Sequence, residues 1–317
     1  MLPLVYTKNS SINDSISLLE NLRKDLLILP ISRKQQLMLS WETVLSRINE
    51  ALLTHRMNIS EAEIYKILRG GDSDPETRDM IFKYKSCIDY VRSNWYVCDE
   101  PITPDTIEHL SSILSGTGKR SKGGGITVQS YEDIKKIFHF LQDGQEHPVI
   151  QAGIAYVQVI TTQSLTKNRG DIALFIIYIF LYKYGWDFRE LLDIQEKLLQ
   201  DRVEYNRIID ITRQTNNATT WLTYFISIMV EEVRKLVQTI QKPHSVAKEL
   251  RAFITINPRQ EQILTYLQDP QSQITNKDVQ RLFHISQITA SRDLSHMTML
   301  GLLFSHGKAR SSYYTLA

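Results

Sequence analysis

Cysteine is scarce in this sequence, with Cys87 and Cys98 the two among 317 residues. Two cysteines without metal-ligand spacing exclude a scaffold stapled by disulfides and a cysteine-based zinc site. The eight histidines are scattered and form no spaced pair or His/Cys cluster suited to zinc. We therefore expect two free thiols, no metal site and a reducing compartment, the cytoplasm.

Long apolar runs and a large net charge are also lacking. The strongest run, Ile172 to Tyr182, has 11 residues, whereas a bilayer-spanning helix needs roughly 20. The first residues lack the basic, apolar and small-residue regions of a secretory signal. A net charge of +2 does not by itself argue for a nucleic acid or a membrane as partner. We expect a buried helix at Ile172 to Tyr182 and no membrane partner.

Helical periodicity is what the sequence has in abundance. From Ile12 to about His139, apolar residues recur every three or four positions. Ser60, Thr103 and Ser130 precede helical stretches and can accept hydrogen bonds from free backbone amides, so they predict helix starts. Breaks in the periodicity are expected at residues 29–30, 70–75, 101–104 and 115–130. This pattern predicts an all-α region.

The pattern changes from Pro258 onwards, to three helices followed by two short strands. Thr275 begins the second helix, with Asp278 completing a capping box, and Ser286 begins the third, which Gly301 ends. The strands are expected at residues 302–304 and 312–316. This order is typical of a helix-turn-helix extended by a β wing.

Three phrases further up the chain carry a family resemblance. They are HPVIQAGIAYVQVITTQSLTKNRGDIALF from His147, DRVEYNRIID from Asp201 and NNATTWLTYFISIM from Asn216. Together they resemble the Fic (Fido) nucleotidyl transferases over about residues 36–240, in which a helix of the type HPxxxAxxAHxxF precedes the loop HPFxxGNGRxxR. The C-terminal pattern resembles the winged helix often found in Fic proteins. The alternative is that the phrases are core positions of an unrelated α bundle.

The resemblance implies an all-α fold, a Fic-like helical core with a C-terminal winged helix-turn-helix and a small β wing. It divides the chain into an N-terminal helical region at 1–110, a Fic-like core at 111–240 and a winged-helix domain at 241–317. In an ungapped alignment, the family's active-loop positions, from its histidine to its second arginine, are held by Gln163, Ser164, Lys167, Asn168, Arg169, Gly170, Asp171 and Leu174. A shift of one residue restores no catalytic set, and the register stays open.

The residues at these positions do not suit the family's chemistry. Gln163 stands at the catalytic histidine, and a carboxamide accepts no proton near neutral pH; loss of a general base costs ~10² to 10⁴ in rate. Lys167 stands where an acidic residue would hold a divalent metal, and its charge would repel one. Asp171 would repel phosphates where an arginine holds them. The resemblance therefore implies a lost metal site and no ordinary AMP transfer.

A nucleotide site without metal remains one of two interpretations of the loop. Lys167 and Arg169 precede a helix N-terminus, which favours anions. With Ser164, Asn168 and Gly170 they are the candidate contacts for ATP or another nucleotide. The other interpretation is that both cations are solvated loop charges.

An inhibitory-type helix is the family's second feature, with the pattern Ser/Thr-x-x-x-Glu-Gly/Asn. Ser46 and Glu50 fit it and Ala51 departs from it. Since Leu174 stands at the position of the arginine with which the glutamate would pair, Glu50 has lost that partner. An exposed glutamate on an amphipathic helix explains Glu50 equally well.

Two functions follow from these observations. The first is a degenerate Fic-family regulatory protein that binds DNA or a target protein through its winged helix; the candidate DNA contacts are Gln287, Thr289, Ser291, Arg292, Lys308 and Arg310. From Arg251 to Ala317, seven Lys or Arg and four Asp or Glu give a mild basic excess of three. The second is an active Fic-type nucleotidyl or phosphoryl transferase with an altered loop. Either function is compatible with a monomer or with a homodimer.

Overall fold

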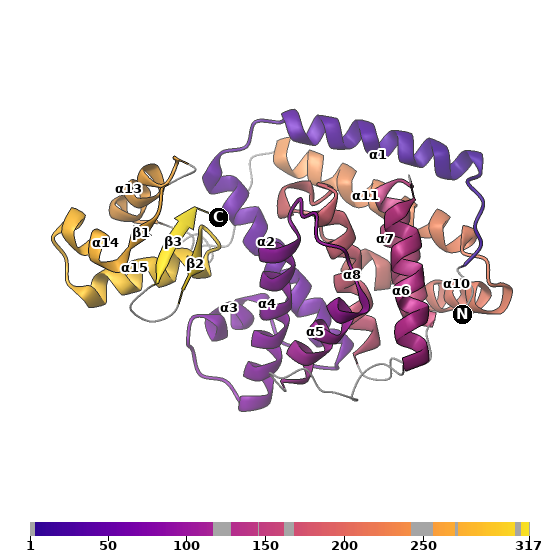
Figure 1. The fold of residues 1–317 in the computed structure, drawn as a ribbon, viewed down its shortest axis with the longest axis horizontal. Helices are drawn as coiled ribbons and strands as arrows, with labels where there is room; N and C mark the ends of the chain where they lie inside the picture. Colours follow the sequence, from indigo (N-terminus) through magenta and orange to yellow (C-terminus); the bar gives the residue numbers. More distant parts are fainter. Residues whose placement is uncertain are drawn as a thin grey trace. The chain divides into compact units, whose positions relative to one another are not determined.

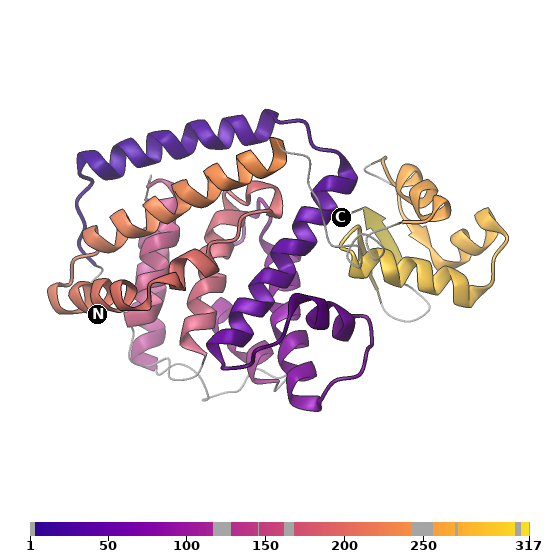
Figure 2. The same ribbon diagram turned by 180° about the vertical axis from the view of Figure 1, so that it is seen from behind.

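The computed structural model describes residues 4–116, 128–144, 146–161, 168–241, 256–269, 272–307 and 312–316. These residues are mostly helical, with one small three-stranded sheet, as Figures 1 and 2 show. This confirms the predicted fold class, an all-α protein with a small β wing. The chain forms two compact units, the larger comprising Met1–Ile31 with Glu42–His244 and the smaller Ser32–Trp41 with Ser245–Ala317. The predicted boundary at residue 110 falls inside the larger unit and stays a prediction.

The larger unit is built from helices. Its elements are α1 (Ser10–Ile28), α2 (Arg33–Thr54), α3 (Glu61–Leu68), α4 (Pro75–Trp95), α5 (Pro104–Ser115), α6 (Val128–Asp143), α7 (Pro148–Thr161), α8 (Arg169–Lys183), a short turn (Phe188–Glu190), α9 (Gln195–Gln200), α10 (Arg202–Thr215) and α11 (Thr219–Gln241). The first residues of α2 belong to the smaller unit. The breaks expected at residues 29–30, 70–75 and 101–104 fall between these elements or reach the first residue of the next helix. Most of the break expected at 115–130 lies outside the described residues.

Two of the three predicted helix starts are confirmed. Ser60 accepts a hydrogen bond from the backbone of Glu63, whose carboxylate accepts one from the backbone of Ser60. Thr103 is the N-cap of α5. The prediction for Ser130 is wrong, because α6 begins two residues earlier, at Val128. Backbone hydrogen bonds define where a helix begins, and they extend upstream of this serine.

α8 is the central helix of the larger unit. Every side chain from Ile172 to Tyr182 is buried, which confirms the expectation of a buried helix. α7 lies along α8, and α4 and α5 also contact it (Figure 1). A helix that is apolar on all sides needs such neighbours around its whole circumference.

α7 and α11 approach closely at a glycine. Gly153 accepts a hydrogen bond of 2.8 Å from the indole N–H of Trp221, on whose ring Tyr156 stacks with centroids 4.9 Å apart. A Cβ atom at residue 153 would lie 2.8 Å from Cδ1 of Phe225 and 3.0 Å from Cδ2 of Leu222. Two of the three phrases that carry the family resemblance thus pack against each other.

The smaller unit has the three predicted helices followed by the two predicted strands, and a further short strand, β1, lies between the first two helices. Its elements are α13 (Pro258–Tyr266), β1 (Ile274–Thr275), α14 (Asn276–Phe283), α15 (Gln287–Met299), β2 (Leu303–His306) and β3 (Tyr313–Leu316). The strands form an antiparallel sheet in the order β1-β3-β2, with Ile274 opposite Tyr314 and Leu303 opposite Leu316. The capping box of Thr275 and Asp278 and the helix start after Ser286 are confirmed.

A buried carboxylate ties α13 to α15. Asp293 is 6% exposed and accepts hydrogen bonds from Arg259 Nε at 2.5 Å, Gln260 Nε2 at 3.2 Å and Asn257 Nδ2 at 3.3 Å. In the same unit, the indole of Trp41 donates to the carbonyl of Leu300 at 3.3 Å. A buried charge is stable only when it is paired and hydrogen-bonded, and Asp293 meets that condition.

The close approach at Gly153 predicts a loss of stability on substitution. Gly153→Ala should lower the free energy of unfolding by about 1 to 3 kcal/mol, because the added methyl group overlaps Phe225 and Leu222. Gly170→Ala is the matched control, since a Cβ atom there meets nothing within 4 Å. Urea denaturation of the two variants measures the difference. Equal losses in both would contradict the packing described here.

Candidate functional site

The first turn of α8 is where the predicted active loop enters the core. Asn168 precedes the helix in a left-handed conformation (φ 53°, ψ 25°), which asparagine adopts more readily than most residues. Arg169 and Gly170 are the first two helical residues. Of the other loop candidates, Gln163, Ser164 and Lys167 lie outside the described residues.

The side chain of Arg169 points back towards α7. Its Nη1 donates a hydrogen bond of 3.3 Å to the carbonyl of Ile160, in the last turn of that helix. A cation is favourable at the C-terminal end of a helix, where free carbonyls concentrate partial negative charge. Arg169 therefore has a structural contact that competes with any contact to an anion.

Asp171 is the third residue of α8 and places a buried carboxylate in its first turn. The residue is 6% exposed, and its Oδ2 lies 3.1 Å from Nε2 of His55, which directly follows α2. Tyr84 on α4 lines the same narrow cavity as Asp171. A negative charge in the first turn of a helix is stabilised by the helix dipole. The positive end of α8 is thus already matched by a carboxylate of the chain itself.

This carboxylate shifts the titration of its neighbours. The hydrogen bond to Asp171 raises the pKa of His55 above its usual value, and burial opposes the shift. Burial and then the charge of Asp171 raise the pKa of the Tyr84 hydroxyl and bring that of the Cys87 thiol to about 12. Cys87 and Tyr84 are therefore neutral at physiological pH. The side chain of His55 is 32% exposed, and histidine is the residue type of this cluster whose usual pKa is nearest neutrality.

The space beside Asp171 is too small for a nucleotide. A narrow cavity of about 10 Å³ is lined by Arg47, Ala51, Tyr84, Ile88, Asp171, Leu174, Phe175, Tyr178 and Gln195. That is about the space of one water molecule, whereas small-molecule sites measure roughly 300 to 1,000 Å³. Ala51 and Leu174, the two departures from the inhibitory pairing, line this same cavity.

Arg47 anchors α2 beside α8. It is buried, its guanidinium carbon lies 3.8 Å from the centre of the Tyr178 ring, and its Nη2 donates to the carbonyl of Leu192. Thr43, one turn earlier, donates to the carbonyl of Leu191 at 3.3 Å. The sequence did not single out Arg47, since an arginine on an amphipathic helix is usually exposed.

Ser46 and Glu50, the inhibitory-type candidates, are half-buried on α2. Burial and the charges of Glu196 and Asp193 raise the pKa of Glu50, and Arg202 opposes the shift. Leu174, at the position of the family's second arginine, is buried and apolar. The surroundings of Glu50 are therefore largely acidic, unlike those of a glutamate that pairs with an active-site arginine.

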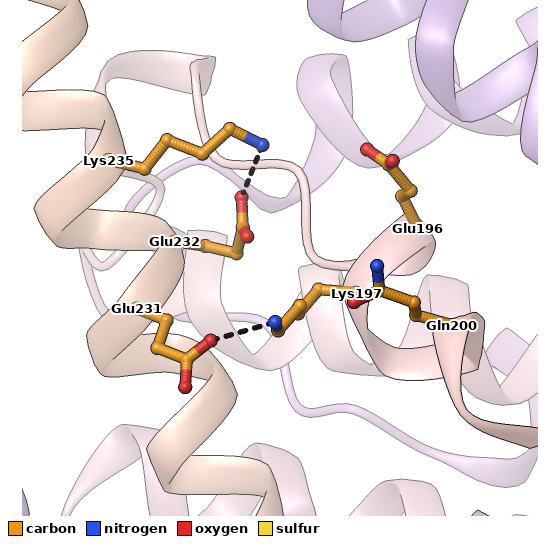
Figure 3. Close-up of a pocket in the computed structure, with 6 residues that line it drawn as sticks. All are labelled: Glu196, Lys197, Gln200, Glu231, Glu232 and Lys235. Carbon is orange, nitrogen blue, oxygen red and sulfur yellow. Dashed lines mark hydrogen bonds and ion pairs between the residues drawn. The ribbon is translucent and has the colours of Figure 1, made fainter.

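A hollow between α9 and α11 is occupied by ion pairs (Figure 3). Lys197 lies 3.0 Å from Glu231, and Lys235 lies 3.4 Å from Glu232. Glu196 and Gln200 complete the lining. Each lysine has a carboxylate partner beside it, and exposed pairs of this kind contribute at most about 1 kcal/mol to stability. The hollow offers no group that is set apart for a ligand.

Two further findings concern the described residues as a whole. They contain no group of three or more His, Cys, Asp or Glu side chains arranged to hold a metal ion. None of the helices in the described ranges combines the length and the apolarity that crossing a bilayer requires. Both cysteines, Cys87 and Cys98, are free thiols, as the sequence predicted.

The DNA-contact candidates on α15 differ in how accessible they are. Gln287, Ser291 and Arg292 are exposed, whereas Thr289 is half-buried and its hydroxyl lies 3.0 Å from that of the N-cap Ser286. Ser291 accepts a hydrogen bond of 2.8 Å from the side chain of Asn276. Lys308 and Arg310, the candidates on the wing, lie outside the described residues.

Comparisons with known proteins show what the fold resembles. No protein-family model and no curated protein matches the sequence. Among solved structures, a Fic family protein from Desulfovibrio desulfuricans G20 matches with a TM-score of 0.63, over 100% of this chain and 98% of that chain, at 10% identity. Residues 134–508 of Fic-1 from C. elegans match with a TM-score of 0.56, over 72% of this chain and 71% of that chain, at 14% identity.

Likeness at such low identity shows the fold and leaves the activity open. The full-length match covers nearly all of both chains, and it agrees with the three phrases of the sequence that resemble the same proteins. The chain therefore has the Fic fold.

Proposed function

We propose that this chain is a degenerate Fic-fold regulatory protein that binds DNA through its C-terminal unit, a winged helix, and does not carry out AMP transfer. It uses no metal, and no nucleotide is required for its action. The proposal has two halves, the loss of a phosphate site at α8 and the gain or retention of a DNA-binding surface at α15.

The loss of the phosphate site is supported by the burial of Asp171. An arginine at this position of the family holds phosphates, but Asp171 brings a negative charge that is paired with His55. A phosphate at the same helix end would meet a like charge from which it is not shielded by water. The alignment of Gln163 with the family's histidine points the same way.

The DNA-binding half rests on the charge distribution of α15. Its single carboxylate, Asp293, is buried and bound to Arg259, so it does not oppose Arg292 on the exposed face. Two other exposed side chains there, Gln287 and Ser291, are polar groups of the kind that read base edges in known complexes. The helix that follows the turn of a helix-turn-helix enters the major groove.

The competing function is nucleotidyl or phosphoryl transfer with an altered loop. The observation that favours it is the presence of Arg169 in the first turn of α8, where free amides also favour anions. Against it, Arg169 contacts the end of α7 and Asp171 lies two residues further on. Regulation through DNA is therefore the better-supported proposal.

The absence of AMP transfer can be tested with labelled ATP. We expect the full chain to transfer no label to itself or to candidate proteins with magnesium, and to release no heat with ATP analogues at millimolar concentration. Arg169→Ala and Lys167→Ala should change neither result. Label transfer by the wild type that both substitutions abolish would establish the competing function.

DNA binding can be tested by gel shift against genomic fragments at rising salt. The affinity should fall steeply with salt, because the protein displaces counterions from phosphates. Arg292→Ala should weaken specific binding by about 5- to 150-fold, as expected for a base-reading arginine. Arg207→Ala, an exposed arginine of α10 paired with Glu204, is the matched control and should bind like the wild type. Equal behaviour of both variants would contradict the role of α15.

A further inference from the structure

The first turn of α15 exposes an aliphatic side chain among polar ones. Ile288 is 66% exposed and lies between Gln287, also exposed, and Thr289. Burying an aliphatic side chain of this size gains about 1.5 to 3 kcal/mol of free energy, which an exposed side chain does not contribute. The position therefore suits a residue that is covered when a partner binds.

The polar groups next to Ile288 are partly committed to the unit itself. The hydroxyls of Ser286 and Thr289 form the N-cap, and the hydroxyl of Ser291 is held by Asn276. Ile288 and Arg292 are four residues apart, so their side chains lie on the same face of the helix, one turn from each other. This face thus offers an aliphatic group and a cation together.

A face that offers a cation and an aliphatic side chain is suited to an anionic partner that carries a small apolar group. Asp293 is buried against Arg259, so α15 presents Arg292 without an exposed carboxylate. The residues directly before and after Ile288 in the sequence, Gln287 and Thr289, are polar. In the major groove of DNA, the apolar group on a base edge is the methyl of thymine, and arginine binds O6 and N7 of guanine.

We propose that Ile288 contacts a thymine methyl in the major groove while Arg292 binds a guanine nearby. The proposal rests on the proposed function, that α15 binds duplex DNA. One helical turn spans about 5.4 Å and successive base pairs are about 3.4 Å apart, so the thymine and the guanine should lie within about two base steps. Ile288 is then the residue that restricts the binding sequence at the thymine position.

Selection from a random duplex library with the full chain, followed by base substitution, tests this assignment. Replacing the critical thymidine by deoxyuridine removes one methyl group and should weaken binding of the wild type about fourfold, the effect of one buried group of that size. Ile288→Ala should bind the two duplexes equally. Ile28→Ala, the same substitution at an isoleucine of α1 that is 79% exposed, is the matched control and should keep the fourfold preference.

Each outcome separates this inference from the function on which it rests. Wild-type binding that is salt-dependent and sequence-selective, yet indifferent to uracil at every thymine, would overturn the role of Ile288 and leave DNA binding intact. An Ile288→Ala variant that keeps the preference for thymine would do the same. Failure to bind any duplex would overturn both, and a protein captured through α15 in place of DNA would do so as well.

Discussion

The structure of the larger unit depends on a buried carboxylate at the beginning of its central helix. Asp171 lies in the first turn of α8, where His55 from the end of α2 hydrogen-bonds it and Tyr84 from α4 lines the same narrow cavity. Leaving a buried charge unpaired is strongly unfavourable, so these contacts hold three helices together at one point. The carboxylate also matches the positive end of α8 from within the chain.

Buried carboxylates have comparable effects in the two units. Asp171 and Asp293 are each 6% exposed, and each is bound by residues from other helices. In the larger unit the charge lies in the first turn of α8, at the positive end of the helix dipole. In the smaller unit the pairing of Asp293 with Arg259 removes a negative charge from the surface of α15, so that the exposed Arg292 is available to an anionic partner. Each carboxylate is thus stabilised by a partner that the chain itself supplies.

The sequence predicted the parts of the fold that depend on local patterns. The apolar run from Ile172 and the capping box at Thr275 were assigned correctly, because burial and capping leave signals within a few residues. β1 was missed because it has two residues and is defined by its pairing with β3. The contact of His55 with Asp171 joins positions 116 residues apart, so no pattern within a short stretch of sequence could predict it. Arg47 was missed for the same reason, since its partners on α8 and at Leu192 are distant in the sequence.

The titration of His55 tests the central role of Asp171 most directly. Because the pair raises the pKa of His55 above 6.5, its contribution to stability is complete below the unfolded pKa and is lost as the pH rises through the folded one. NMR of the imidazole should therefore give a raised pKa in the wild type and a value close to the usual one in Asp171→Asn. The same pKa in both proteins would contradict the account.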